Sequence, residues 1–302
     1  MEHHTAGDPT KPDLLYTHVP VAQLVRQLDH LGLSVSSPVV TELLSDLGLG
    51  RRQLVKSKTY PDSPNRDQQF RRLDRYRQQF QQRGQPILSL DSKQTELLGN
   101  LFRPGTVWST APIPVLDHTF EWYATGHFVP HGIYDLHHHH GHLTLNQSRD
   151  TGVFATDALG SYWDTHGRSA WPDAHEVLVL CDCGGSNKVD SWVFKRGLWQ
   201  FAQSTGLTVR VCHYPRYCSK YNPIERRLFS VVHRCWQGAQ WTEAEQAADQ
   251  ARNLYSTTGL RVTAEVWDRE YKRNKPMPQA ERAEIPVTHD ETLAEYNYVL
   301  SP

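Results

Sequence analysis

The sequence predicts an α/β domain built on a mixed sheet and preceded by a small helical unit. Short apolar runs alternate with segments of helical periodicity between residues 86 and 236, and apolar residues before residue 50 recur at helical spacing. Two of the apolar runs end in an aspartate. With 302 residues and 38% hydrophobic content, the chain can bury a sizeable core.

The first 50 residues divide into a polar start and two predicted helices. Residues 1–12 are polar, and we expect them to be flexible. A helical repeat begins at Val19 and stops at Gly32, and a second begins with Ser37 and Pro38 and stops at Gly48. Residues 13–50 are therefore predicted to form a partial helix-turn-helix segment that binds DNA through its second helix. An ordinary helical hairpin explains the same pattern equally well.

Residues 51–85 are predicted to form a basic helical linker. Residues 51–90 contain ten Lys or Arg against three Asp. Phe70, Leu73, Tyr76 and Phe80 lie on one stripe of a helix. The charge suits contact with a polyanion, although a solvated helix face accounts for it as well.

Residues 86–302 are predicted to form the main domain. Apolar or alternating runs indicate strands, and segments of 3.6-residue periodicity indicate helices. The strands are expected at 86–90, 106–128, 139–146, 176–181 and 207–213, and the helices at 150–163, 191–204 and from Glu225 to about Trp236. Three strands followed by helix, strand, helix, strand and helix is the element order of the RNase H-like fold.

Three acidic residues are the candidate catalytic and metal-binding residues. Asp91 and Asp182 each follow an apolar strand, and Glu225 follows an Asn–Pro helix start. In open α/β sheets, sites gather at the carboxyl ends of strands. Carboxylates from separate elements can hold two Mg²⁺ ions, which activate a nucleophile and stabilise the leaving oxygen at a phosphodiester. A turn-forming role for Asp91 and a helix-dipole role for Glu225 are the plainer alternatives.

Cations surround Glu225 in the sequence and suggest contact with DNA phosphates. They are Arg216, Lys220, Arg226, Arg227 and Arg234. The residues that we expect to contact DNA are Lys93, Asn187, His213, Lys220, Asn222 and Arg226.

Other metal sites are disfavoured. A zinc site from Cys181, Cys183, Cys212, His213 and Cys218 matches no common spacing. The tract from His137 to His140 cannot aim all its side chains at one ion, and we expect it to be neutral for function. The odd cysteine count predicts reduced thiols. The absence of a long apolar run or a signal peptide predicts a cytoplasmic protein without a membrane partner.

These motifs resemble the bacterial insertion-sequence transposases of the ISAzo type (number thirteen), a family with a DDE catalytic domain. The matching stretches are ordered along nearly the whole chain. They are AGDP at 6–9, LSLDSKQTELLGN at 88–100, HGIYDL at 131–136, CDCGGSN at 181–187, CHYPRYCSKYNPIERRLFS at 212–230, TTGLRV at 257–262 and YNY at 296–298.

The resemblance implies an RNase H-like catalytic domain that depends on Mg²⁺ or Mn²⁺, with Asp91, Asp182 and Glu225 as its metal-binding triad. The expected activity is cleavage at transposon ends followed by transfer of the freed 3′ hydroxyl to target DNA. The expected partners are the terminal inverted repeats and target DNA, bound by a dimer or larger assembly associated with the bacterial nucleoid.

One departure from the family concerns the beginning of the chain. Family members start with a longer DNA-binding region, so the chain is interpreted as a truncated copy. A catalytically inactive DNA-binding remnant and an RNase H-like nuclease that only hydrolyses are the alternative functions.

Overall fold

The computed structural model describes residues 5–8, 11–17, 19–52, 65–273 and 275–302. The chain divides into two compact units, Met1–Lys58 and Thr59–Pro302. Most of the predicted linker before residue 65 lies outside the described residues.

The smaller unit contains a β-hairpin and two helices. Strands β1 (Thr5–Asp8) and β2 (Lys11–Thr17) pair antiparallel, whereas residues 1–12 were predicted to be flexible; residues 1–4 and 9–10 lie outside the described part. Helices α1 (Val21–His30) and α2 (Ser37–Asp46) are followed by Gly32 and Gly48, both with positive φ. The two helices lie where the sequence predicts them, and their role in DNA binding stays a prediction.

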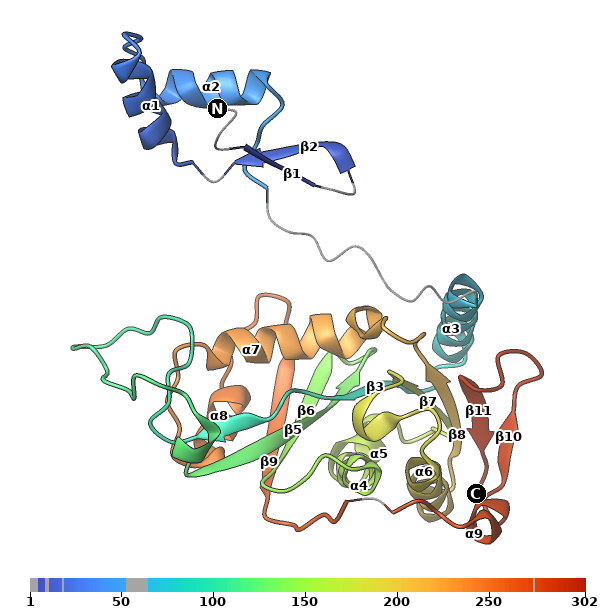
Figure 1. The fold of residues 1–302 in the computed structure, drawn as a ribbon. Helices are drawn as coiled ribbons and strands as arrows, with labels where there is room; N and C mark the ends of the chain where they lie inside the picture. The colour runs from blue at the N-terminus through green and yellow to red at the C-terminus, as the bar shows by residue number, and fades with distance from the viewer. Residues whose placement is uncertain (1–4, 9–10, 18, 53–64, 274) are drawn as a thin grey trace. The chain divides into compact units, whose positions relative to one another are not determined.

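The larger unit alternates strands and helices (Figure 1). Its strands are β3 (Ile87–Ser92), β4 (Glu96–Leu98), β5 (Gly126–Asp135), β6 (His140–Asn146), β7 (Glu176–Cys181), β8 (Thr208–His213), β9 (Arg261–Trp267), β10 (Val287–His289) and β11 (Asn297–Leu300). Its α-helices are α3 (Arg66–Gln82), α4 (Gly152–Tyr162), α5 (Arg168–Ala170), α6 (Trp192–Thr205), α7 (Ser230–Trp236), α8 (Ala244–Arg252) and α9 (Gln279–Ala283). Two π-helical turns, η3 (Trp163–Gly167) and η6 (Glu225–Phe229), adjoin α4 and α7, and short 3-10 turns are η2 (Glu121–Tyr123), η4 (Gly185–Asn187) and η5 (Ser219–Tyr221).

The main sheet has the order β10-β11-β8-β7-β3-β5-β6-β9. Strands β3, β7 and β8 are parallel, and β5 and β6 run antiparallel as a hairpin beside β3. Taken in chain order, the strands β3, β5, β6, β7 and β8 form a five-stranded core in the RNase H-like arrangement. The predicted fold class is therefore confirmed.

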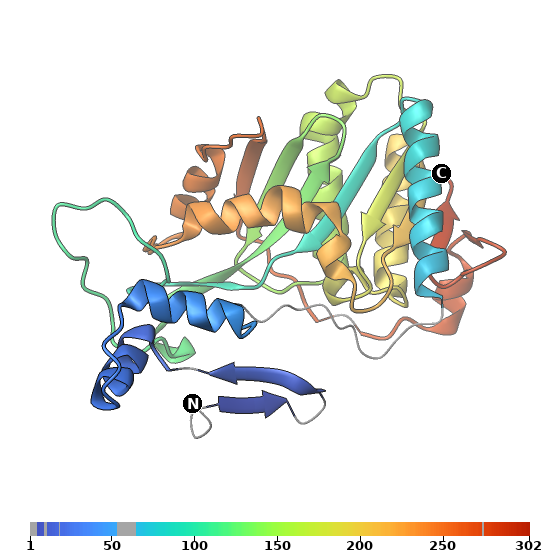
Figure 2. The same ribbon diagram turned by 90° about the horizontal axis from the view of Figure 1, so that it is seen from above.

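Helices cover both faces of this sheet, which explains why its strands are apolar on both sides. Helices α4 and α6 pack on one face, where Leu88, Leu90 and Cys181 are buried. The opposite face carries α3, which packs against Leu178 and Leu180, and helices α7 and α8 over β5 and β6 (Figures 1 and 2).

The strand predicted at 106–128 was wrong. The chain from residue 101 to 120 is irregular and extends away from the sheet, and the strand β5 begins only at Gly126 (Figure 1). Pro104, Pro112 and Pro114 lie in this connection, and proline removes the backbone donor that a strand ladder needs. No helix among the described residues is long and apolar enough to cross a membrane.

A substitution at Gly141 tests the packing of η6 against the sheet. A β-carbon at Gly141 would approach Leu228 Cδ1 to 2.4 Å, whereas one at Gly160 in α4 would meet no atom within 4 Å. We expect Gly141→Ala to destabilise the protein by about 1–3 kcal/mol through overpacking. Gly160→Ala, the matched control, should be neutral or stabilising. Thermal unfolding of both variants checks this; a neutral Gly141→Ala would contradict the packing.

Candidate active site

Asp91 and Asp182 lie side by side at the carboxyl ends of two neighbouring strands. Strands β3 and β7 are parallel, and their last paired residues are Leu90 and Cys181. Both residues are buried beneath α4 and α6. Because side chains alternate along a strand, Asp91 and Asp182 are directed to the opposite face of the sheet.

Glu225 is attached to the same strand by a buried hydrogen-bond network. Ser89 Oγ donates to Asn222 Oδ1 at 2.5 Å and accepts from Ile224 N at 3.1 Å. Asn222 Nδ2 donates to the carbonyl of Leu90 at 3.2 Å. Asn222 is fully buried, so these bonds satisfy polar groups that would otherwise be costly. They hold the segment before Glu225 against the strand that ends in Asp91.

A glycine opposite Asp91 allows η6 to approach the sheet. Gly132 of β5 pairs with Asp91, and a β-carbon at Gly132 would approach Phe229 Cε1 to 2.6 Å and Ile224 Cδ1 to 2.9 Å. Glu225 begins the π-helical turn η6, a local widening that is frequent at functional sites.

The three carboxylates interact electrostatically. Burial raises the pKa of Asp91 well above its usual range, and the charges of Asp182 and Glu225 raise it further. Burial also raises the pKa values of Asp182 and Glu225, and Asp182 adds to the shift at Glu225. Lys93 opposes the shift at Glu225. The carboxylates thus lie near enough to repel one another in an environment that disfavours their charge.

The loop after β7 orients Asp182 through its own backbone. Asp182 Oδ1 accepts from Gly184 N at 3.0 Å. A β-carbon at Gly184 would lie 3.2 Å from Asp182 Oδ2, so glycine leaves room for the carboxylate. The Asp182 carbonyl accepts a hydrogen bond from His213 Nδ1 at 2.7 Å.

A fourth carboxylate, Asp150, borders this group and was missed in the sequence. Its charge raises the pKa values of both Asp91 and Asp182. Asp150 Oδ1 accepts from Ser92 Oγ at 2.8 Å, and Ser92 Oγ lies 3.0 Å from His131 Nδ1. An aspartate just before a Thr-capped helix is common, so no local pattern distinguished it.

Three of the six predicted DNA contacts are placed near the triad. Lys93 lies over the Trp236 ring and pairs with Glu96. Lys220 and Arg226 are exposed on either side of Asn222.

The other three predicted contacts face the protein interior, so a role in DNA contact does not fit their placement. Asn222 belongs to the network with Ser89. His213 is fully buried between Asp182 and Tyr298, and burial lowers its pKa to about 4. Asn187 is 1% exposed. Polar residues beside a reactive motif resemble surface contacts in the sequence, and only the packing of distant segments shows them buried.

The cysteines and the histidine tract take structural positions. Cys181 packs beneath α4 and α6, whereas Cys212 packs with α3 on the other face, which separates the two thiols. The backbone amides of His137 and His138 donate to Asp135 Oδ1 at 2.9 and 3.1 Å, so Asp135 organises the turn that carries the tract.

The triad has the donor chemistry for Mg²⁺ or Mn²⁺, since its ligands are hard carboxylate oxygens. In the described ranges, no three His, Cys, Asp or Glu side chains are gathered closely enough to complete an ion site by themselves. Mutual repulsion among uncompensated carboxylates accounts for such spacing, and a divalent cation would relieve it.

An RNase H-like sheet with acidic residues at the ends of its two central parallel strands is characteristic of enzymes that act on phosphodiesters. A family model described as "Rhodopirellula transposase DDE domain" matches residues 1–302. The chain therefore belongs to this family of DDE transposases, and the resemblance seen in the sequence is confirmed.

Among solved structures, the chain is similar to three Mos1 complexes. These are the Mos1 transposase paired-end complex with left transposon end (14% identity, TM-score 0.42), a pre-cleavage Mos1 transpososome (14%, 0.43) and the Mos1 strand transfer complex (16%, 0.40). Each alignment covers 81% of this chain and 71%, 71% and 70% of the respective Mos1 chain. These likenesses are remote, and the family assignment does not depend on them. No curated protein matches the chain.

Replacing Asn222 tests its reassignment from DNA contact to structural link. We expect Asn222→Ala to lower the free energy of unfolding by about 1–3 kcal/mol for each buried group left unsatisfied. DNA affinity in EDTA should stay close to wild type because the side chain is buried. The exposed Asn253→Ala is the control. An unchanged melting temperature with weakened DNA binding would show instead that Asn222 contacts DNA.

Replacing Asp91 tests the electrostatic environment. A carboxyl whose folded-state pKa is raised stabilises the protein fully below its unfolded pKa of about 4, and this contribution is lost as pH rises through the folded pKa. In EDTA, Asp91→Asn should therefore raise the melting temperature, and more so near pH 8 than near pH 5. Mg²⁺ should then stabilise wild type but not the variant. A variant that is less stable than wild type at both pH values would contradict this account.

Proposed function

We propose that Asp91, Asp182 and Glu225 form the catalytic centre with which this DDE transposase cuts and joins DNA. The observation that carries the proposal is the convergence of three carboxylates from β3, β7 and η6, each of which has a raised pKa. Groups with perturbed pKa values that share one edge of a sheet are typical of a reaction centre.

The three carboxylates would hold Mg²⁺ or Mn²⁺, two ions in our proposal. When bound, these ions supply activation of the nucleophile and charge stabilisation at the phosphate. Asp91 and Asp182 offer oxygens from neighbouring strands, and Glu225 offers oxygens from the helix that Asn222 fixes to β3. The protein's own contribution is to hold these oxygens in place before the DNA arrives.

The proposed reaction has two stages that use one site. In the first, a water oxygen attacks the phosphorus at the transposon end, and the bond to the 3′ oxygen breaks. That oxygen takes up a proton as a 3′ hydroxyl, and the flanking strand keeps the 5′ phosphate. In the second, the 3′ hydroxyl oxygen attacks a target phosphorus in line and displaces the target's 3′ oxygen. One phosphodiester bond replaces another, so joining needs no external energy source.

Lys93, Lys220 and Arg226 are the proposed phosphate contacts that remain from the sequence. Lys93 lies close enough to Glu225 to affect its pKa. Cations near a scissile phosphate position the backbone and offset its charge. Double-stranded DNA, as terminal repeats and target, is the proposed substrate, and two copies of the chain would hold the two ends.

Substitution of the triad tests the proposed function. Asp182→Ala should abolish cutting of a labelled duplex that carries the element's end, and also joining of a pre-cut end, because both stages use one site. A loss of at least about 10³-fold is expected for a group that contributes about 4 kcal/mol to the transition state. Denaturing gels resolve cut and joined strands.

Glu245→Gln, which removes an exposed carboxylate paired with Arg252, is the control and should retain both activities. Cutting by Asp182→Ala at the wild-type rate would overturn the assignment. Cutting without joining in wild type would favour a hydrolytic nuclease instead.

A further inference from the structure

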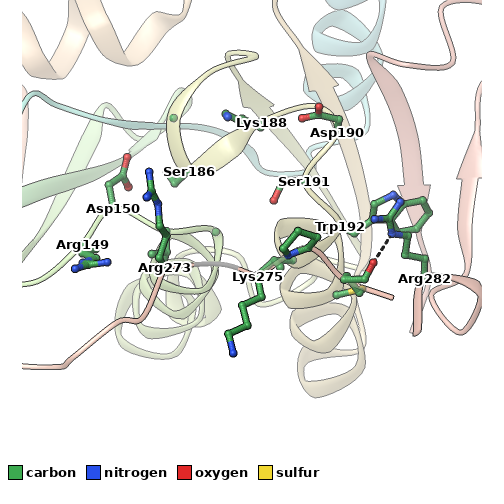
Figure 3. A pocket seen from close by; sticks show the side chains of 16 residues that line it. Arg149, Asp150, Ser186, Lys188, Asp190, Ser191, Trp192, Arg273, Lys275 and Arg282 are labelled. Carbon is green, nitrogen blue, oxygen red and sulfur yellow. Dashed lines mark hydrogen bonds between the residues drawn. The ribbon is translucent and has the colours of Figure 1, made fainter. Parts of the chain in front are cut away.

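A basic pocket lies beside the proposed catalytic centre. It is a cavity of about 770 Å³ that borders the amino ends of α4 and α6 (Figure 3). Its cationic side chains are Arg149, Lys188, Arg273, Lys275 and Arg282. Only Lys275 is seen to point away from the hollow in this view, while Asp150 and Ser186 lie toward one end and Trp192 and Arg282 toward the other (Figure 3).

The positive charge of this basic pocket is largely uncompensated. Two acidic residues, Asp150 and Asp190, line it beside the five cations. None of the five cations has a carboxylate within ion-pair distance in the part of the chain that the structure describes. Five cations around one hollow repel one another, so an anion in the hollow is favoured.

Two helix ends add to this preference. Thr151 caps α4 by accepting from Phe154 N at 3.1 Å, and Ser191 caps α6 by accepting from Phe194 N at 3.3 Å. Thr151, Gly152, Ser191 and Trp192 all line the pocket, so both helix amino ends face it. The partial positive charge and the free amides of a helix start favour phosphate.

The wall of the basic pocket is shared with the catalytic centre. Asp150, Gly185 and Ser186 line the pocket, and Asp150 interacts electrostatically with Asp91 and Asp182. Ser92, the residue after Asp91, bonds to Asp150 and lies 3.3 Å from Ser186 Oγ. A ligand in the pocket therefore lies one residue layer away from the proposed reacting phosphodiester.

We propose that the basic pocket binds the backbone phosphates of one DNA strand as that strand leaves the catalytic centre. This inference rests on the proposed function and names a second DNA-binding site within it. None of its cations belongs to the motifs from which the triad was predicted. A concave hollow fits a single strand better than the flat surface of a duplex, and Trp192 offers an aromatic surface on which an unpaired base can stack. The strand has two sources, namely the flank of the transposon end and the target DNA.

The first test measures binding without catalysis. A short fluorescein-labelled single strand and its duplex are titrated in EDTA with wild type and with Lys188→Ala/Arg273→Ala. We expect the double variant to bind the single strand about tenfold more weakly, and its salt dependence to flatten by about 0.7 for each phosphate that is no longer neutralised. The matched control is Arg168→Ala, which removes an exposed cation paired with Asp164 on another element.

Two further variants separate charge from folding. Lys188→Arg/Arg273→Lys should bind within about twofold of wild type because it keeps both charges. Arg149→Gln should weaken binding by itself, and its melting temperature verifies that the fold is intact. The proposal is overturned if the double alanine variant binds like wild type, if its binding is weakened no more than that of Arg168→Ala, or if the charge-preserving variant is equally defective.

The second test identifies the source of the strand. Loss of joining of a pre-cut end with normal cutting would assign the pocket to target DNA, whereas loss of cutting would assign it to the flank. Neither loss, with unchanged binding, would overturn the proposal. If wild type neither cuts nor joins, the proposed function fails while the binding experiment still decides on the pocket.

Discussion

The catalytic arrangement depends on a buried polar link between the central strand and the chain segment that carries Glu225. Ser89 and Asn222 are both fully buried in an otherwise apolar environment, where an unpaired hydroxyl or amide would be costly. Their partners are each other, the amide of Ile224 and the carbonyl of Leu90. One position of the helix on the sheet satisfies all of these groups. The register of Glu225 against Asp91 therefore follows from hydrogen bonding as well as from the apolar contacts of Leu228 and Phe229.

Charge is distributed in two adjoining regions around this link. Asp91, Asp182, Glu225 and Asp150 gather acidic groups at the carboxyl ends of β3 and β7. The basic pocket begins on the other side of Asp150. The acidic region suits divalent cations, and the basic pocket suits the phosphates that those cations would accompany. Both regions rest on rigid elements, since α4 and α6 are packed directly on the sheet.

Much of this architecture could be predicted because its signals are local. Strand ends with aspartates and an Asn–Pro helix start indicated the triad, and the order of elements indicated the fold. The irregular connection before β5 contains apolar residues without a sheet partner, so it resembled a strand. The strands β9, β10 and β11 were not predicted; β9 joins the sheet beside β6, which is distant in the sequence.

The basic pocket could not be predicted for a similar reason. Arg149 and Lys188 follow different strands, and Arg273 lies far along the chain in an irregular segment. Only the packed structure brings these side chains to one hollow. Conversely, His213 and Asn222 stand beside reactive motifs in the sequence, and the fold uses both of them to hold the backbone near the acidic residues.

Iron-directed cleavage of the protein tests most directly whether three separate segments meet at one metal. Fe²⁺ that replaces Mg²⁺ would generate hydroxyl radicals at its binding site in the presence of ascorbate and peroxide, and these radicals cut the nearby backbone. The account predicts fragments that end near Asp91, Asp182 and Glu225 and that disappear together when Mg²⁺ competes. Fragments that end only near the tract from His137 to His140, or cuts near one triad member without the others, would contradict it.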